Sequence, residues 1–141
     1  MDTNSKRVKI MVIEDNEFFN QLLTTRLKNY IYPIADDQQF ELQLLSYTDP
    51  KDALKNVDSD LDIVFLDYFL GDSVTGMEIM KKIKEVTDSC NIIIISQIKS
   101  LQTSLVTLLE GASEFILKDK NAITRSCYVA EEMIYKRLRY A

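Results

Sequence analysis

The chain has no histidine and no tryptophan, and only three glycines, two prolines and two cysteines among its 141 residues. Without histidine there is no imidazole base, no imidazole metal ligand and no phosphohistidine within the chain. Serine-protease-like triads and common zinc sites are therefore not expected. None of the glycines belongs to a glycine-rich phosphate loop, so we expect no Walker or dinucleotide site. Any chemistry must rely on carboxylates, hydroxyls, lysines or a bound metal.

Other scarcities limit the class of protein. Cys90 and Cys127 are too few for a disulfide framework, and their apolar neighbours predict buried, reduced thiols, as in the cytoplasm. No run approaches the roughly 20 apolar residues of a membrane span, and the polar residues 1–9 do not resemble a signal peptide. The net charge of −5 argues against direct nucleic-acid binding, which usually needs a basic surplus. The length predicts one domain, 1–141, with its core from about 8 to 139.

Short apolar runs predict the strands of a buried parallel sheet. The runs cover residues 8–13, 61–66, 92–95 and 115–117, while 41–47 alternates between polar and apolar residues and predicts an edge strand. Apolar stripes at helical spacing lie between these runs and predict five helices that pack against the sheet. Strand and helix thus alternate five times, which implies right-handed crossovers and helices on both faces.

Three local features of this scheme can be tested directly. The stripe of the fourth helix (Leu101, Leu105, Leu108 and Leu109) is expected to face the sheet. Asp49-Pro50 predicts the N-cap and first residue of the second helix. Segment 32–40, which contains Pro33, is expected to be a loop, and Gly111 is expected to take a left-handed conformation after the fourth helix.

Polar side chains stand where four of the predicted strands end: Glu14 and Asp15, then Asp67, then Ser96, then Lys118. Each alone is a common loop or cap residue. In doubly wound sheets, however, ligands bind outside the carboxyl ends of the strands, so we expect these side chains to converge.

The chemistry of this set is specific. Three neighbouring carboxylates repel one another and need a cation, for which Mg²⁺ is suited by its preference for oxygen ligands. Such a cation offsets the charge of a phosphoryl donor, and a carboxylate can attack phosphorus to form an aspartyl-phosphate. Lys118 supplies a positive charge to a phosphoryl oxygen, and the Ser96 hydroxyl can donate a hydrogen bond to another. The sequence predicts a magnesium pocket in which Asp67 accepts a phosphoryl group.

These motifs make the chain resemble the receiver domain of bacterial two-component response regulators, including the chemotaxis type, from about Val8 to Leu138. They are Val12-Ile13-Glu14-Asp15-Asn16, Val64-Phe65-Leu66-Asp67-Tyr68, Ile94-Ile95-Ser96, and Gly111-Ala112 followed by Phe115-Ile116-Leu117-Lys118. The resemblance implies a flavodoxin-like (βα)₅ fold, a doubly wound five-stranded parallel sheet with strand order 2-1-3-4-5.

The resemblance also implies a role for each site residue. Asp67 is the phospho-acceptor, and Lys118 pairs with the phosphoryl group. Glu14, Asp15 and Asp67 hold Mg²⁺ together with the backbone carbonyl of Phe69.

A switch is implied as well. Ser96 moves to bond the phosphoryl group and Phe115 turns inward, which remodels the surface of the fourth helix, fifth strand and fifth helix. That surface would contact a downstream protein and allows a homodimer. The donor must be a separate sensor histidine kinase or phosphotransfer protein, because the chain has no histidine. The protein would catalyse only its own phosphorylation and dephosphorylation. No output segment follows the last predicted helix, so we expect a stand-alone regulator or a piece of a longer one.

Three departures from the family pattern bear on the rate and lifetime of phosphorylation. Gln97 stands where a small residue is usual and can shield the phosphoryl group. Asp119 replaces a proline that often follows a cis bond; a cis bond here would cost about 3 kcal/mol, so either a trans bond reshapes the loop or packing offsets the cost. Gly76 lies one place later than usual, which indicates a one-residue insertion.

Two alternatives stay open. Gln97 and Asp119 are compatible with a receiver-like interaction module that never takes phosphate. A magnesium phosphatase acting through an aspartyl-phosphate is the other, but many of these carry a second aspartate two residues after the nucleophile. Phe69 occupies that place, which counts against this class.

Overall fold

Five parallel strands form one sheet in the order β2-β1-β3-β4-β5, as the sequence and the resemblance predict. The computed structural model describes residues 6–71 and 74–140. The two ends of the predicted domain lie outside the described residues, and so do residues 1–5 of the polar N-terminal segment 1–9. The strands are β1 (Lys6–Ile13), β2 (Phe40–Tyr47), β3 (Ile63–Asp67), β4 (Asn91–Ser96) and β5 (Glu114–Leu117). The alternating segment is the edge strand β2, as expected.

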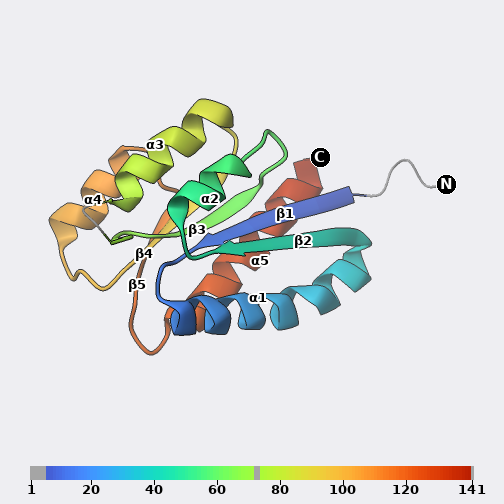
Figure 1. The fold of residues 1–141 in the computed structure, drawn as a ribbon. Coiled ribbons are helices and arrows are strands. Elements are labelled where there is room, and N and C mark those ends of the chain that lie inside the picture. The colour runs from blue at the N-terminus through green and yellow to red at the C-terminus, as the bar shows by residue number, and fades with distance from the viewer. Residues whose placement is uncertain (1–5, 72–73, 141) are drawn as a thin grey trace.

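Helices cover both faces of the sheet (Figure 1). They are α1 (Glu17–Gln38), α2 (Pro50–Lys55), α3 (Gly76–Val86), α4 (Leu101–Leu109) and α5 (Ala122–Tyr140). Helices α1 and α5 lie on one face and α2, α3 and α4 on the other. Because side chains alternate along each strand, the sheet divides the apolar core into two clusters. Cys127 belongs to the α1–α5 cluster and Cys90 to the other, and both are free and buried, as predicted.

The expected loop over segment 32–40 is wrong, because helix α1 continues through Pro33 to its end at Gln38. Ile31 and Ala35 extend the buried stripe of this helix at a spacing of four residues, and both are packed in the core. This burial outweighs the missing N–H of Pro33, which costs a helix interior about 3 kcal/mol. The residue after the helix, Gln39, is its C-cap and has a left-handed backbone with a φ of 58°.

The predicted orientation of α4 is also wrong. Its leucine stripe faces solvent, and the buried residue of this helix is instead Thr107, whose hydroxyl donates to the Ser104 carbonyl at 2.8 Å. Helix α4 contributes no side chain to either core cluster. Helical periodicity shows that a face is apolar but not what covers it, so the sequence alone could not reveal this orientation.

Several local predictions are confirmed. Asp49 caps α2 by accepting a hydrogen bond from the backbone of Lys51, with Pro50 as the first helical residue. Gly111 follows α4 with a φ of +117°. In α1, however, the apolar side chain of Leu22 is 39% exposed, although apolar residues at helical spacing are expected to pack against the sheet. Within the described ranges, no helix is long and apolar enough to cross a membrane.

Candidate functional site

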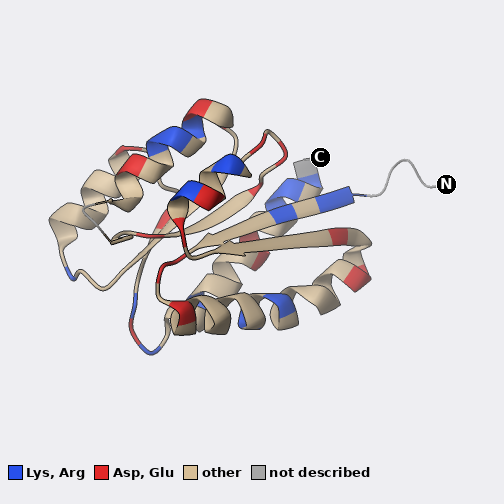
Figure 2. Cartoon of the chain, in the orientation of Figure 1, with Lys and Arg blue, Asp and Glu red and all other residues tan. Residues whose placement is uncertain are grey.

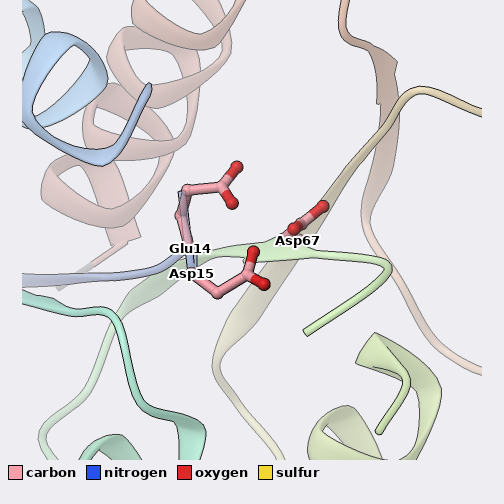
Figure 3. Close-up of side chains that lie close together, drawn as sticks. All are labelled: Glu14, Asp15 and Asp67. Carbon is pink, nitrogen blue, oxygen red and sulfur yellow. The ribbon is translucent and has the colours of Figure 1, made fainter. Parts of the chain in front are cut away.

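Three carboxylates meet at the carboxyl ends of the neighbouring strands β1 and β3. Glu14 and Asp15 follow β1, Asp67 ends β3, and one carboxylate oxygen from each lies within 4.8 Å of the other two (Figure 3). Glu14 and Asp67 are buried, while Asp15 is exposed. They line a cavity of about 600 Å³ whose other walls are Asn16, Phe18, Phe19, Phe69, Gln97 and Lys118. The structure thus brings together the acids and the lysine that the sequence singles out.

The turn from β1 into α1 is held by two asparagines. Asn16 caps the helix by accepting from the backbone of Phe19 at 2.9 Å, and its own N–H donates to Glu14 at 3.1 Å. The buried amide of Asn20 donates to the backbone carbonyls of Glu14 and Tyr47, each at 3.0 Å. Asn20 therefore fixes the acidic turn against the end of β2. Sequence reasoning missed it, although a polar residue beside an apolar helical stripe was the available signal.

Lys118 reaches the same acids from the end of β5. Its Nζ lies 2.5 Å from Glu14 Oε1 and 3.2 Å from Asp67 Oδ1, and its side chain is only 11% exposed. The Phe19 ring, whose centroid is 4.8 Å from Nζ, covers the ammonium as a cation–π partner. Phe19 also packs against the core cluster under α1 and α5. The structure gives it a second contact, with the charge of the site.

The electrostatics of the site leave negative charge uncompensated. Burial and the neighbouring Glu14 carboxylate, against the opposing effect of Lys118, raise the pKa of Asp67 to about 8. The buried Glu14 Oε1 is in ion-pair contact with Lys118 and accepts no other hydrogen bond from the described residues. One ammonium does not neutralise three carboxylates, and a divalent cation fits this donor set.

The loop after β3 contains a backbone carbonyl, that of Phe69, beside the cavity. Phe69 pairs with Thr75 in an isolated antiparallel bridge, while the flanking hydrogen bonds are made by Tyr68 and Leu70. In such a non-hydrogen-bonded pair, the backbone groups point away from the partner residue. No residue of 6–71 or 74–140 donates a hydrogen bond to the Phe69 carbonyl, and Phe69 lines the cavity. This carbonyl is thus available as the fourth protein ligand of a magnesium ion.

Gly76 is a positioning residue that sequence reasoning treated only as the sign of an insertion. A Cβ atom at Gly76 would lie 2.7 Å from the backbone oxygen of Asp67 and 3.1 Å from Tyr68 Cα. The Gly76 N–H also donates to the Tyr68 carbonyl at 2.6 Å. The start of α3 therefore packs directly on the backbone that carries Asp67, which only glycine permits.

Ser96 lies close to the site but does not line the cavity. Its buried hydroxyl accepts from the backbone of Ile98 at 3.0 Å, and its carbonyl accepts from the backbone of Lys118 at 2.7 Å. Phe115 is half-buried and packs on the cluster beneath α3. It pairs with Ile94 in the sheet, two residues before Ser96 on the same face. The two predicted switch residues thus share one face of the sheet.

Asp119 follows Lys118 through a trans bond, since no cis peptide occurs in the described part of the chain. Its side chain accepts from the backbone of Asn121 at 2.8 Å and its carbonyl accepts from Ala122 at 3.1 Å. The cost of a non-proline cis bond therefore does not arise. Asp119 instead forms the capped turn that leads into α5.

The fold and the site together define a doubly wound, flavodoxin-like α/β domain with an acidic pocket at the point where the strand order reverses, between β1 and β3. The family model of the response regulator receiver domain matches residues 10–125, and the chain belongs to this family. It is thus a receiver domain of two-component response regulators, which are not classical enzymes. No curated protein matches the chain.

Solved receiver domains share the fold. One from Clostridium thermocellum is 23% identical, with a TM-score of 0.72 over 93% of this chain and 98% of that one. One from a Francisella response regulator is 18% identical, with a TM-score of 0.74 over 92% and 98% of the two chains. A Burkholderia pseudomallei response regulator, solved with a phosphorylated aspartic acid, a calcium ion and citrate, is 18% identical, with a TM-score of 0.61 over 89% and 74%.

Proposed function

We propose that this receiver domain accepts a phosphoryl group on Asp67 from an external donor, with Mg²⁺ in the acidic pocket. The observation that carries the proposal is the position of Asp67, buried among two further carboxylates and within 3.2 Å of the Lys118 ammonium. The Burkholderia response regulator, with its phosphorylated aspartic acid and metal ion, supports it.

The proposed roles follow from where each group lies. Glu14, Asp15, Asp67 and the Phe69 carbonyl would hold the cation. Mg²⁺, when bound, offsets the charge of the phosphoryl oxygens. One Asp67 oxygen forms a bond to phosphorus as the bond from phosphorus to the donor atom breaks. The Lys118 ammonium then exchanges its contact with Asp67 for one with a phosphoryl oxygen.

The proposed output is a change in the surface formed by α4, β5 and α5. Ser96 would release the Ile98 backbone and bond the phosphoryl group, and Phe115 would turn into the space that opens beside it. Their common face of the sheet supports this coupling. The remodelled surface would bind a downstream protein, and it also allows a homodimer.

Receiver domains interact with histidine kinases and downstream effectors. We assign the donor role to a sensor histidine kinase or phosphotransfer protein, because this chain has no histidine of its own. The protein would catalyse only its own phosphorylation and dephosphorylation. The buried free thiols support a cytoplasmic location, and the net charge of −5 supports a protein partner rather than nucleic acid. We propose that residues 1–141 form one receiver domain.

Incubation with acetyl phosphate and Mg²⁺, followed by intact-mass measurement, tests the proposal. The native chain should gain one phosphoryl group and Asp67→Asn none, because the amide cannot attack phosphorus. Asp49→Asn, an equivalent change at an exposed cap outside the site, should leave the adduct intact.

Two other outcomes would replace the proposal. No adduct in the native chain would favour a receiver-like module that takes no phosphate. Gln97, which lines the cavity, is compatible with this alternative. Turnover of an unrelated phosphoester would favour a phosphatase. Phe69, rather than a general acid, occupies the place two residues after Asp67 and argues against that class.

Affinity for Mg²⁺ should increase with pH. Since the pKa of Asp67 is raised to about 8, the cation must displace a proton from this carboxyl at neutral pH. Each pH unit below 8 should therefore lower the affinity for Mg²⁺ by up to about 10-fold. Calorimetric titrations between about pH 6 and pH 8, in buffers of different ionisation enthalpy, measure both the affinity and the released proton. Asp67→Asn should bind weakly with little pH dependence. A native affinity that is flat with pH, without proton release, would contradict this prediction.

A further inference from the structure

The Lys118 ammonium has one neighbour without charge, the ring of Phe19. Figure 2 shows basic colouring in the segment after β5 and acidic colouring in the turn from β1 into α1, two segments that the ion pair between Lys118 and Glu14 joins. Phe19 lies in the first turn of α1, and Lys118 Nζ stands over its ring at 4.8 Å from the centroid. This distance is within the range of a cation–π contact. Two carboxylates and one aromatic face thus hold the same ammonium.

The ring is held in place, whereas the lysine is flexible. The Phe19 backbone N–H donates to the Asn16 side chain at 2.9 Å, and the Phe19 side chain packs against the core cluster under α1 and α5. A lysine has a four-carbon stem with many rotamers and an ammonium that water hydrates strongly. The Lys118 side chain is nevertheless only 11% exposed. The ring is therefore a fixed wall that keeps water away from a charge that can move.

The two carboxylates alone do not keep Lys118 in place during phosphoryl transfer. Glu14 and Asp67 are also proposed ligands of the cation, and their attraction for the ammonium falls when a cation offsets their charge. Asp67 loses its free charge as well when it bonds to phosphorus. The Phe19 ring is neither a proposed ligand nor a reacting group, so its attraction for the ammonium persists through both changes. Among the described residues, it is the one contact of this ammonium that does not depend on the charge of the acids.

We propose that Phe19 is a positioning residue for phosphoryl transfer and acts through Lys118. Its ring keeps the ammonium beside Asp67 while a cation occupies the acids, so that Lys118 is already in place when a phosphoryl oxygen arrives. No bond to Phe19 forms or breaks. The inference rests on the proposed acceptor role of Asp67, and it makes the rate of transfer depend on an aromatic residue of α1.

The position of the ammonium can be measured without a phosphoryl donor. In the native chain with saturating Mg²⁺, the ring current of Phe19 should move the proton resonances of the Lys118 ε-methylene upfield, because this group adjoins the Nζ atom over the ring. Phe19→Leu should return these resonances to ordinary lysine positions. Tyr32→Leu is the matched control, since Tyr32 is a 53% exposed aromatic residue of the same helix outside the cavity, and it should keep the native shift. Ordinary lysine resonances in the native chain would overturn the proposal.

The rate of phosphorylation by acetyl phosphate tests the role of the ring. Phe19→Leu keeps an apolar side chain but loses the aromatic face, and it should slow transfer to Asp67 by about 3-fold to 30-fold. Its affinity for Mg²⁺ should stay close to the native value, because the ring is not a proposed ligand. Phe19→Tyr keeps the aromatic face and should retain a near-native rate. Replacement of Phe19 by pentafluorophenylalanine keeps the size of the ring and reverses its quadrupole, so it should slow transfer without loss of packing. A native rate in Phe19→Leu, or an equal loss of Mg²⁺ affinity, would overturn the proposal.

A double-mutant cycle shows whether Phe19 acts through Lys118. Lys118→Met removes the ammonium and keeps an unbranched stem, so in this background Phe19→Leu should change the rate by less than about 2-fold. An equally large effect in both backgrounds would mean that the ring acts through packing alone, and would overturn the proposal. The two proposals fail in different ways. If the native chain takes no phosphoryl group, the acceptor role of Asp67 falls and this inference falls with it, whereas a phosphorylated native chain with no effect of Phe19→Leu rejects only the role of Phe19.

Discussion

Replacing Asp67 by asparagine should stabilise the folded chain by about 1–3 kcal/mol at neutral pH in metal-free buffer, although it removes the proposed acceptor. Asp67 is buried beside Glu14, and its pKa is raised from an ordinary value near 4 to about 8. Folding at neutral pH therefore requires either burial of an ionised carboxylate or uptake of a proton. Asparagine has the same shape and avoids both costs, and its amide can donate to Glu14 as the protonated carboxyl does.

The gain should depend on pH in a defined direction. Below about pH 4 the Asp67 carboxyl is protonated in both the folded and unfolded chain, so the native protein loses nothing. As pH rises toward 8, only the unfolded chain releases the proton, and the native protein loses stability relative to the variant. The stabilisation by asparagine should therefore grow across this window and level off above pH 8.

Urea unfolding in EDTA at several pH values between about 5 and 9 measures this difference. The exposed Asp15→Asn variant is the control, and its stability should differ from the native value by no more than about 0.5 kcal/mol. Saturating Mg²⁺ should reduce the advantage of Asp67→Asn, because the cation stabilises only the chain that binds it well. A less stable Asp67→Asn variant, or a gain that does not change with pH, would show that Asp67 carries no such cost.

Gly76→Ala should destabilise the fold by about 1–3 kcal/mol and weaken Mg²⁺ binding. Helix propensity alone predicts the opposite sign, since alanine in a helix is favoured over glycine by about 1 kcal/mol. The added Cβ would lie 2.7 Å from the Asp67 backbone oxygen, and the neighbouring atoms are backbone atoms that cannot rotate away. The start of α3 and the end of β3 must separate, which displaces the Asp67 carboxylate from the other ligands.

Gly71→Ala is the matched control in the same loop. Gly71 has a φ of +76°, so alanine there costs about 1–2 kcal/mol of backbone strain, but the nearest atom to its Cβ is Asp15 Oδ2 at an ordinary 3.6 Å. Both variants should lower stability in urea unfolding, while only Gly76→Ala should lower Mg²⁺ affinity strongly in calorimetric titration. Equal losses of affinity would mean that the loop as a whole, and not the close contact at Gly76, positions Asp67.

The strands and their carboxyl ends could be predicted because both are encoded locally. A buried parallel strand is a short apolar run, and Asp67 or Ser96 is simply the first polar residue at its end. Once the strands are parallel, their ends share one edge of the sheet, so the convergence of the acids with Lys118 follows from topology. The same reasoning recovered the edge strand β2 and the N-cap Asp49.

Other features depend on contacts between segments far apart in the chain. The continuation of α1 beyond Pro33 is decided by the packing of Ala35 in the core, which outweighs a local helix breaker. The close contact at Gly76 requires the relative position of α3 and β3, and the contact of Phe19 with Lys118 joins the first helix to the last strand. No pattern within a window of the sequence reports such distances.

The division of the core by the sheet gives each half its own chemical reporter. Cys127 lies in the layer under α1 and α5, and Cys90 in the layer under α2 and α3. Burial raises the pKa of the Cys90 thiol to about 12 and also raises that of Cys127, so both are unreactive toward disulfide reagents while covered. The rate at which each thiol is labelled therefore reports the opening of one layer. The two labelling rates, measured in the same native chain, would tell whether the two sides of the sheet open together or one at a time.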